Sequence, residues 1–321
     1  MIGRAIALAV ALFVPASLAH AQPAAKIYRI GILAVGDQAR LRAALHAVGY
    51  VEGRNALFES RDTGGDAARD DASAKALVLG GVDVIIATYP GAVLAAKRAT
   101  ATIPIVMVNT PDPVQLGIVS SLARPGGNVT GTTSLSVDAT VKQIEILKEA
   151  VPGAQRIAVL WNPDNPWHPL VVRALRNETR PAHGAIRLFP VRQPVDIDGT
   201  FEAISREHID AVVVPADPML HAPANRARIT RLLLANRLPS IGGLRTFADA
   251  GGMMSYWADE SDLYQRVASY VDRILQGAAP GVLPIEQPTK YELVVNAKTV
   301  SALGRTMPQA LLLRATVVQS R

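Results

Sequence analysis

The sequence predicts an α/β protein of two Rossmann-like lobes with parallel sheets, joined by a three-segment hinge. Short apolar runs rich in β-branched residues alternate with longer segments of helical composition, which is typical of parallel sheets covered by helices on both faces. An internal repeat predicts two such lobes. Arg29–Leu33 is similar to Arg156–Leu160, and Val82–Ile86 is similar to Ile209–Val213, both at a separation of 127 positions. A separation shared by two pairs favours a duplicated unit.

In the first half, strands and helices are expected to alternate along the chain. The expected strands are Tyr28–Leu33, Ala56–Ser60, Val82–Ala87 and Ile103–Val108, and the expected helices are Ala39–Val48, Asp70–Leu79 and Ala92–Ala101. The strands are apolar and β-branched, whereas the helices contain residues of high helix propensity. Gly80 and Gly81 suit the end of the second helix. Thr88 or Gly91 is expected to cap the third helix.

The second half repeats this alternation, and a tail follows it. The expected strands are Arg156–Leu160, Ile186–Val191 and Ile209–Pro215, and the expected helices are Leu170–Arg180, Ile197–Glu207 and Asn225–Asn236. Leu238–Ser240 continues the repeat with Ile103–Ile105 at a separation of 135 positions. In the tail we expect an amphipathic helix at Asp259–Gln276, a strand at Tyr291–Asn296 and a further segment at Thr299–Leu303 that ends at Gly304.

Three crossings between the lobes are expected, and together they form a hinge rather than a loose tether. They lie near Asn128–Ser134, Gly252–Trp257 and Leu283–Thr289, where Gly and Pro are frequent. The first lobe is therefore expected to comprise residues 28–131 and 257–283, and the second lobe residues 132–256 and 284–321.

The amino terminus is typical of a secretory signal peptide. Residues 1–21 contain one early cation, Arg4, then an apolar core at Ala5–Val14 and an A-x-A pattern at Ala19–Ala21. A membrane-spanning helix needs about 20 apolar residues, and this core is too short. We expect cleavage after Ala21 and export to the periplasm.

A linker of residues 22–27 is expected to precede the first strand of the exported protein. The sequence contains no cysteine, which excludes a cysteine-linked lipid anchor, disulfide bonds and thiolate metal sites. The mature protein is therefore expected to be soluble in the periplasm.

Composition and motifs argue against several classes of protein. The 321 residues include 33 basic and 27 acidic residues, a net charge of +6, but no basic run is typical of nucleic-acid binding. Hydrolase, NTPase and dehydrogenase motifs are absent, and the histidines lack a second ligand at helical spacing. We expect no catalytic residue, metal, cofactor or nucleic-acid partner. A monomer is the default, because no heptad pattern indicates self-association.

Polar residues follow the third and fourth strands of the first half, where open α/β sheets bind ligands. Thr88 and Tyr89 precede a helix whose amino terminus favours a ligand carboxylate; the alternative is that Thr88 only caps this helix. Thr110 and Asp112 follow the fourth strand. Asp112 either accepts from a ligand ammonium group or belongs to an ordinary turn. The sequence therefore predicts a binding site at this edge of the sheet.

Six motifs resemble the ABC-transporter substrate-binding family of the tryptophan-binding-protein type, over residues 27–315. They are Gly49–Asn55, Ile103–Val106, Pro125–Gly131, Asn162–Pro166, Ala250–Tyr256 and Gln287–Leu293. The resemblance implies a type I periplasmic-binding-protein fold and delivery of a solute to an ABC permease in the inner membrane. Characterised relatives bind aromatic amino acids, and most of the family has no known ligand. The loop after the first strand, from Gly36 to Gln38, is shorter than in relatives, which removes pocket wall.

The candidate ligand-binding residues also include positions in the second half and at the crossings. The full set is Gly36, Thr88, Tyr89, Thr110, Asp112, Thr133, Ser134, Asn162, Asp217 and Tyr256. Asn162 and Asp217 follow strands equivalent to those of the first half. Tyr256, Thr133 and Ser134 lie at crossings, where each either contacts the ligand or packs in the hinge. Trp161 and Trp167 either stack on an aromatic ligand or pack in the core.

Together these observations predict an exported solute-binding protein of an ABC importer. Its ligand would be a small molecule, either an amino acid or another small carboxylate, with aromatic ligands included, bound between the lobes by hinge closure. One alternative is an exported enzyme acting in the same cleft, although no nucleophile and base pair is evident. Another is a receptor that serves a signalling partner. A transcription regulator would need an amino-terminal helix-turn-helix, and the signal peptide stands in its place.

Overall fold

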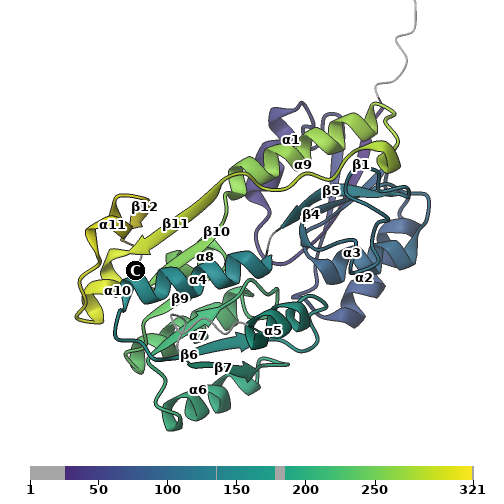
Figure 1. Ribbon diagram of the computed structural model, residues 1–321. Helices are drawn as coiled ribbons and strands as arrows, with labels where there is room; N and C mark the ends of the chain where they lie inside the picture. Colours follow the sequence, from purple (N-terminus) through teal and green to yellow (C-terminus); the bar gives the residue numbers. More distant parts are fainter. Residues whose placement is uncertain (1–25, 135, 178–184, 320–321) are drawn as a thin grey trace, which may run out of the picture.

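The computed structural model describes residues 26–134, 136–177 and 185–319. The predicted signal peptide and most of the predicted linker lie outside these residues. The described strands form two sheets, which lie in different lobes of the molecule (Figure 1).

The first sheet has five parallel strands in the order β2-β1-β3-β4-β5. Their bounds are β1 Tyr28–Ala34, β2 Ala56–Asp62, β3 Val84–Ala87, β4 Ile105–Pro111 and β5 Val129–Ser134. Successive side chains of a strand face opposite sides of a sheet, so each face needs its own cover. Ile30 and Ile32 face one core cluster, whereas Leu33 and Ile85 face another.

Helices cover both faces of this first sheet. They are α1 Ala39–Ala47 and α9 Glu260–Leu275 on one face, and α2 Ala67–Leu79 and α3 Pro90–Ala99 on the other. Helix α9 comes from the distant tail of the chain and packs beside α1, as Figure 1 shows. Leu263, Val267 and Val271 of α9 are buried against β1, β3 and β4, because the helix is strongly amphipathic. The first lobe is therefore completed by residues after 259.

The second sheet has seven strands in the order β12-β11-β10-β9-β8-β6-β7, of which only the β10–β11 pair is antiparallel. The bounds are β6 Arg156–Trp161, β7 Ala185–Pro190, β8 Ala211–Val214, β9 Ser240–Gly242, β10 Met254–Ala258, β11 Tyr291–Asn296 and β12 Ala315–Val318. The order β2-β1-β3-β4-β5 recurs here as β7-β6-β8-β9-β10. The predicted repeat and the predicted fold class are thus confirmed.

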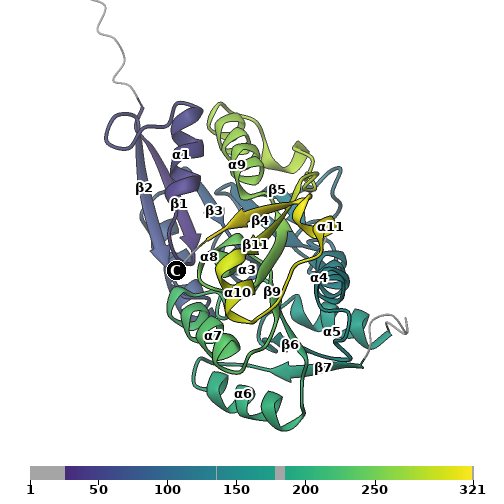
Figure 2. The same cartoon turned by 90° about the vertical axis from the view of Figure 1, so that its left-hand side faces the viewer.

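Helices also cover both faces of the second sheet. Their bounds are α4 Ser136–Ala150, α5 His168–Asn177, α6 Asp196–Arg206, α7 Pro223–Ala235, α8 Arg245–Asp249, α10 Ala297–Ala302 and α11 Gln309–Leu312. Helices α4 and α5 share one core cluster, and α6 and α7 share the cluster on the opposite face (Figure 2). No helix in the described ranges has both the length and the apolar character that a membrane span requires.

The expected helices and strands are present, with ends that differ by a few residues, but two expected crossings are strands. Residues 129–134 form β5 and residues 254–258 form β10, and helix α4 was not predicted. Strand β5 escaped prediction because it is polar in sequence and buried in the fold. Its threonines form hydrogen bonds inside the lobe, from Thr130 Oγ1 to the Leu283 carbonyl and from Thr133 Oγ1 to the Thr110 carbonyl, both at 2.8 Å. The expected helix to Arg180 is described only to Asn177.

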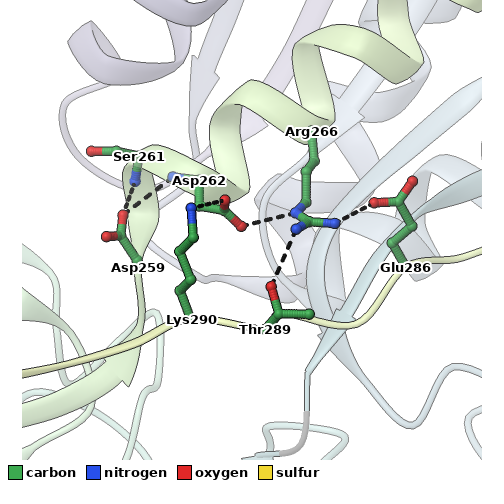
Figure 3. A network of polar contacts seen from close by, with 7 residues as sticks. All are labelled: Asp259, Ser261, Asp262, Arg266, Glu286, Thr289 and Lys290. Carbon is green, nitrogen blue, oxygen red and sulfur yellow. Dashed lines mark hydrogen bonds and ion pairs between the residues drawn. The ribbon is translucent and has the colours of Figure 1, made fainter.

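The chain passes between the sheets after β5, after β10 and before β11. A charged network, shown in Figure 3, joins the second and third of these passages. Arg266 of α9 donates to Asp262 at 2.8 Å, to Glu286 at 2.6 Å and to Thr289 at 3.3 Å. Lys290 pairs with the other oxygen of Asp262 at 3.0 Å. These two cations hold the pKa of Asp262 below its usual value, which keeps the network ionised.

Candidate functional site

A cavity of about 400 Å³ lies between the two lobes, at the carboxyl ends of the parallel strands of both sheets. The first lobe lines it with the loop after β1, the end of β3, the end of β4 and the beginning of α9. The second lobe contributes residues that follow β8 and β9, the beginning of α7 and the end of β10. Ligand sites in proteins commonly have volumes of roughly 300–1,000 Å³. The cavity is therefore large enough for a single small molecule.

Aromatic and aliphatic side chains form much of the cavity wall. Trp167 and Trp257 come from the second sheet's lobe and are almost fully buried. Leu263 and Tyr264, near the beginning of α9, line the cavity from the first lobe. With the Asn109 amide oriented to satisfy its neighbours, its oxygen accepts from Trp257 Nε1 at 2.8 Å. This bond joins β4 of one lobe to β10 of the other and holds the indole ring at the cavity.

Glu260 is a largely buried carboxylate at the cavity. It is the first residue of α9, its side chain is 16% exposed, and one oxygen accepts from Arg40 Nη1 at 2.7 Å. Burial raises the pKa of Glu260, and the Arg40 guanidinium opposes this shift. The other carboxylate oxygen of Glu260 accepts no hydrogen bond from the described residues. Glu260 is thus able to accept from a ligand.

Arg226 brings the opposite charge from the second lobe. It lies in the first turns of α7, and its Nη1 donates to the His221 carbonyl at 2.9 Å. Burial lowers the pKa of Arg226, while the carboxylates of Asp249 and Glu260 raise it. Arg226 and Glu260 both line the cavity, and no ion pair within 4.0 Å joins these two described residues.

Four cavity residues carry a buried polar atom that has no partner among the described residues. These atoms are Gln38 Oε1, His221 Nδ1, Arg226 Nε and Thr246 Oγ1. Buried polar groups in proteins are nearly always hydrogen-bonded, because an unpaired group costs about 1–3 kcal/mol. Half of the buried unpaired side-chain atoms in the described residues thus belong to this one cavity, which favours a polar ligand there.

Four of the predicted site residues line the cavity, namely Gly36, Thr88, Tyr89 and Asp217. The polar groups of the last three already have partners within the chain. Thr88 Oγ1 donates to the Leu33 carbonyl at 3.3 Å, and the Tyr89 hydroxyl donates to Asp70 and contacts Thr63. The Asp217 carboxylate accepts from Asn165 at 2.7 Å and from the Leu220 amide at 2.8 Å.

The expected capping of α3 by Thr88 or Gly91 is wrong. Tyr89 is the N-cap residue, and no side chain caps this helix. Burial and the nearby Asp70 carboxylate raise the pKa of Tyr89, so its hydroxyl stays protonated and donates to Asp70.

The other six predicted residues are not among those that line the cavity: Thr110, Asp112, Thr133, Ser134, Asn162 and Tyr256. Asp112 is exposed, and its Oδ1 accepts from the Gln115 amide at 3.2 Å, as in an ordinary turn. Asn162 donates its backbone N–H to His168 Nδ1 at 2.7 Å. Tyr256 stacks on Tyr291, with ring centroids 5.4 Å apart. Their role in ligand binding stays a prediction.

Sequence reasoning missed Glu260, Arg226, Gln38 and Thr246. A usable signal existed for the two charged residues, because each lies in the first turns of a helix that begins near the cavity. Trp167 lines the cavity, whereas Trp161 does not. No group of three or more potential metal ligands occurs among the described residues.

We expect His221 to make the stability of the protein depend on pH. Burial lowers the pKa of His221 to about 4, and its Nε2 faces the Pro215 carbonyl at 3.2 Å. The unfolded chain, in which the pKa of histidine is about 6.5, therefore binds the proton more tightly than the folded chain. The contribution of neutral His221 to the free energy of unfolding is thus complete above pH 6.5 and is lost as the pH falls toward 4. Between pH 7.5 and 4.5 we expect this residue to remove about 2–3 kcal/mol of unfolding free energy.

Urea unfolding at both pH values checks this expectation. The His221→Gln variant keeps an amide donor for the Pro215 carbonyl but has no titrating group at this position. Between pH 7.5 and 4.5 its free energy of unfolding should therefore fall by about 2–3 kcal/mol less than that of the parent protein. Equal losses in the two proteins would contradict the assignment.

Comparisons with known proteins agree on one family. Residues 37–319 match the family described as ABC transporter substrate binding protein. A tyrosine-binding protein from Clostridioides difficile (strain R20291) is 26% identical over 261 residues, which cover 81% of this chain and 74% of that protein.

Two solved structures show the same fold. A conserved domain protein from Vibrio cholerae has a TM-score of 0.83 and 26% identity, covering 91% of this chain and 99% of that one. An ABC domain from Streptococcus pneumoniae in complex with L-Trp has a TM-score of 0.82 and 23% identity, covering 91% and 100% of the two chains.

Proposed function

This chain belongs to the ABC transporter substrate-binding protein family, and we propose that its ligand is an amino acid with an aromatic or large apolar side chain. The observation that carries the proposal is the interlobe cavity, which combines aromatic walls with partly buried charges of both signs. Two relatives support it: one is named for tyrosine binding, and the other was solved with L-Trp. Trp167, Trp257 and Tyr264 give this cavity the surfaces on which an aromatic side chain stacks.

Binding proceeds by closure of the lobes over the ligand, as in type I periplasmic binding proteins. Several contacts across the cleft support this. Gly65 of the first lobe packs against Pro218 and Met219 of the second. With the Gln115 amide oriented to satisfy its neighbours, its nitrogen donates to Asp112 Oδ2 at 2.7 Å. Its oxygen accepts from Nη2 of Arg173, on α5 of the second lobe, at 2.9 Å. These contacts form when the lobes are close together and stabilise the ligand-bound state.

The remaining features of the proposal concern location and partners. The protein is exported to the periplasm after cleavage behind Ala21, acts as a monomer, carries out no catalytic step and delivers its ligand to an ABC permease. The lobes comprise residues 28–131 with 257–283, and residues 132–256 with 284–321. Strands β5 and β10 run through the first two of these boundaries, so the hinge residues are held in sheets.

A thermal-shift screen of the protein from Gln22 onward, refolded to remove bound solute, tests the proposed ligand class. L-tyrosine, L-tryptophan and L-phenylalanine are compared with aliphatic amino acids and small carboxylates. A ligand at a hundredfold excess over its Kd stabilises the folded protein by about 2.7 kcal/mol. We expect a clear rise in Tm with at least one aromatic amino acid. A protein that no amino acid stabilises would contradict the proposal.

A further inference from the structure

The two lobes present different unpaired hydrogen-bonding groups to the cavity. In the first lobe, Gln38 Nε2 donates to the Gly36 carbonyl at 2.9 Å, which fixes the amide and leaves Oε1 as a buried, unpaired acceptor. Glu260 adds a carboxylate oxygen that Arg40 does not occupy. The first lobe thus offers the acceptor oxygens of Gln38 and Glu260, and Arg40, which also lines the cavity, is already paired with Glu260.

The second lobe offers donors and the positive charge of Arg226, while its carboxylate at the cavity, Asp217, already accepts from Asn165 and Leu220. Arg226 uses Nη1 for the His221 carbonyl, and its buried Nε–H has no partner among the described residues. Thr246, the second residue of α8, has a buried hydroxyl that also lacks a described partner. An Nε–H and a hydroxyl are the donors that a carboxylate accepts from, and the guanidinium supplies the charge.

We propose that these two sets of groups select an α-amino acid zwitterion and orient it between the lobes, which extends the proposed function. Arg226 and Thr246 bind its carboxylate, and Glu260 and Gln38 bind its ammonium group. The side chain then extends along the aromatic wall. Because the two charged ends of one ligand attach to different lobes, full binding requires the closed arrangement.

The alternative position for the carboxylate is the amino terminus of α3, beside Thr88 and Tyr89. The hydroxyl proton of Thr88 already goes to the Leu33 carbonyl, and that of Tyr89 goes to Asp70. The first residue of this helix, Pro90, has no N–H. Side-chain donors without a partner are therefore found at Arg226 and Thr246 and not at this helix terminus.

Ligands that lack one charged end test the proposal without any mutation. Isothermal titration compares L-tryptophan with 3-indolepropionate, which has no ammonium group, and with tryptamine, which has no carboxylate. L-tyrosine, 3-(4-hydroxyphenyl)propionate and tyramine form a second series. In whichever series the amino acid binds, we expect each truncated compound to bind at least about tenfold more weakly. Equal affinity for the amino acid and the deaminated acid would overturn the proposal.

Variants then assign each end of the ligand. Glu260→Gln should lower the affinity for the amino acid by at least about tenfold, because the contact to the ammonium group is lost. The affinity for the deaminated acid, which has no ammonium group, should stay within about twofold of the parent value. Arg226→Gln should lower the affinity for the amino acid and for the deaminated acid, because both have a carboxylate. It should not lower the affinity for the amine, which has none. Arg228→Gln, on the exposed side of α7, is the matched control and should change little. Asp37→Asn removes a competing carboxylate that also lines the cavity, and the loss of affinity should be smaller than for Glu260→Gln.

The outcomes separate this inference from the proposed function. If the parent protein binds no amino acid, both are contradicted. If it binds an aromatic amino acid and the Glu260 and Arg226 variants bind it equally well, only the inference is contradicted. An effect of Asp37→Asn in place of Glu260→Gln would likewise overturn the assignment of Glu260.

Discussion

Replacement of Phe247 by alanine is expected to lower the free energy of unfolding by about 3–5 kcal/mol. Phe247 lies on α8, is 1% exposed and is among the largest fully buried side chains. Its ring lies close enough to Gly242 and Gly252 that an added Cβ on either glycine would fall within 2.3 Å of it. The surrounding backbone is thus built around the ring and would not collapse into the space that alanine leaves.

Urea unfolding of Phe247→Ala measures this loss, with Phe58→Ala as the matched control. Phe58 is only partly buried, and its ring packs against the Arg42 guanidinium, so its removal should cost roughly 1 kcal/mol. Equal costs at the two positions would show that Phe247 is not tightly packed. We also expect weaker ligand binding in Phe247→Ala, because α8 carries Thr246 into the cavity.

The Gly65→Asn variant is expected to weaken ligand binding by about a hundredfold, or ~3 kcal/mol, because it prevents full closure of the lobes. A Cβ on Gly65 would lie 2.7 Å from Pro218 Cβ and 3.2 Å from the Met219 backbone nitrogen. Both atoms belong to the opposite lobe. Because Gly65 has a φ of +78°, asparagine is chosen as the residue that best tolerates the left-handed region.

Gly64→Asn is the control for this experiment, since Gly64 also has a positive φ, of +61°. A Cβ there would meet only the flexible end of the Arg69 side chain, at 3.0 Å. Isothermal titration should therefore give near-parent affinity for Gly64→Asn. Small-angle scattering should show ligand-induced compaction in the parent and in Gly64→Asn but not in Gly65→Asn. Compaction of Gly65→Asn with unchanged affinity would contradict the closure contact.

The elements that sequence reasoning identified are those whose signal is local. Apolar β-branched runs such as Val84–Ala87 and the amphipathic pattern of α9 depend on residues close together in the chain. Strand β5 was missed for the opposite reason. Its buried threonines bond to partners as distant as Leu283, 153 positions away, and no local pattern reveals such partners.

The candidate site divides in the same way. The position of the site, at the carboxyl ends of parallel strands, followed from topology alone, and Gly36, Thr88, Tyr89 and Asp217 do line the cavity. Which polar groups remain available to a ligand did not follow. Tyr89 appeared free in the sequence, yet Asp70 and Thr63 occupy its hydroxyl.

The sequence by itself determined the α/β class, the duplicated lobes and the edge of the sheets where the cavity lies, because apolar periodicity and repeated motifs depend on residues that are close together in the chain. Only the tertiary structure decided that Arg226 and Glu260 face one cavity from different lobes. The physical reason is that a polar side chain becomes available or occupied through its hydrogen-bond partners. In this protein those partners come from distant parts of the chain.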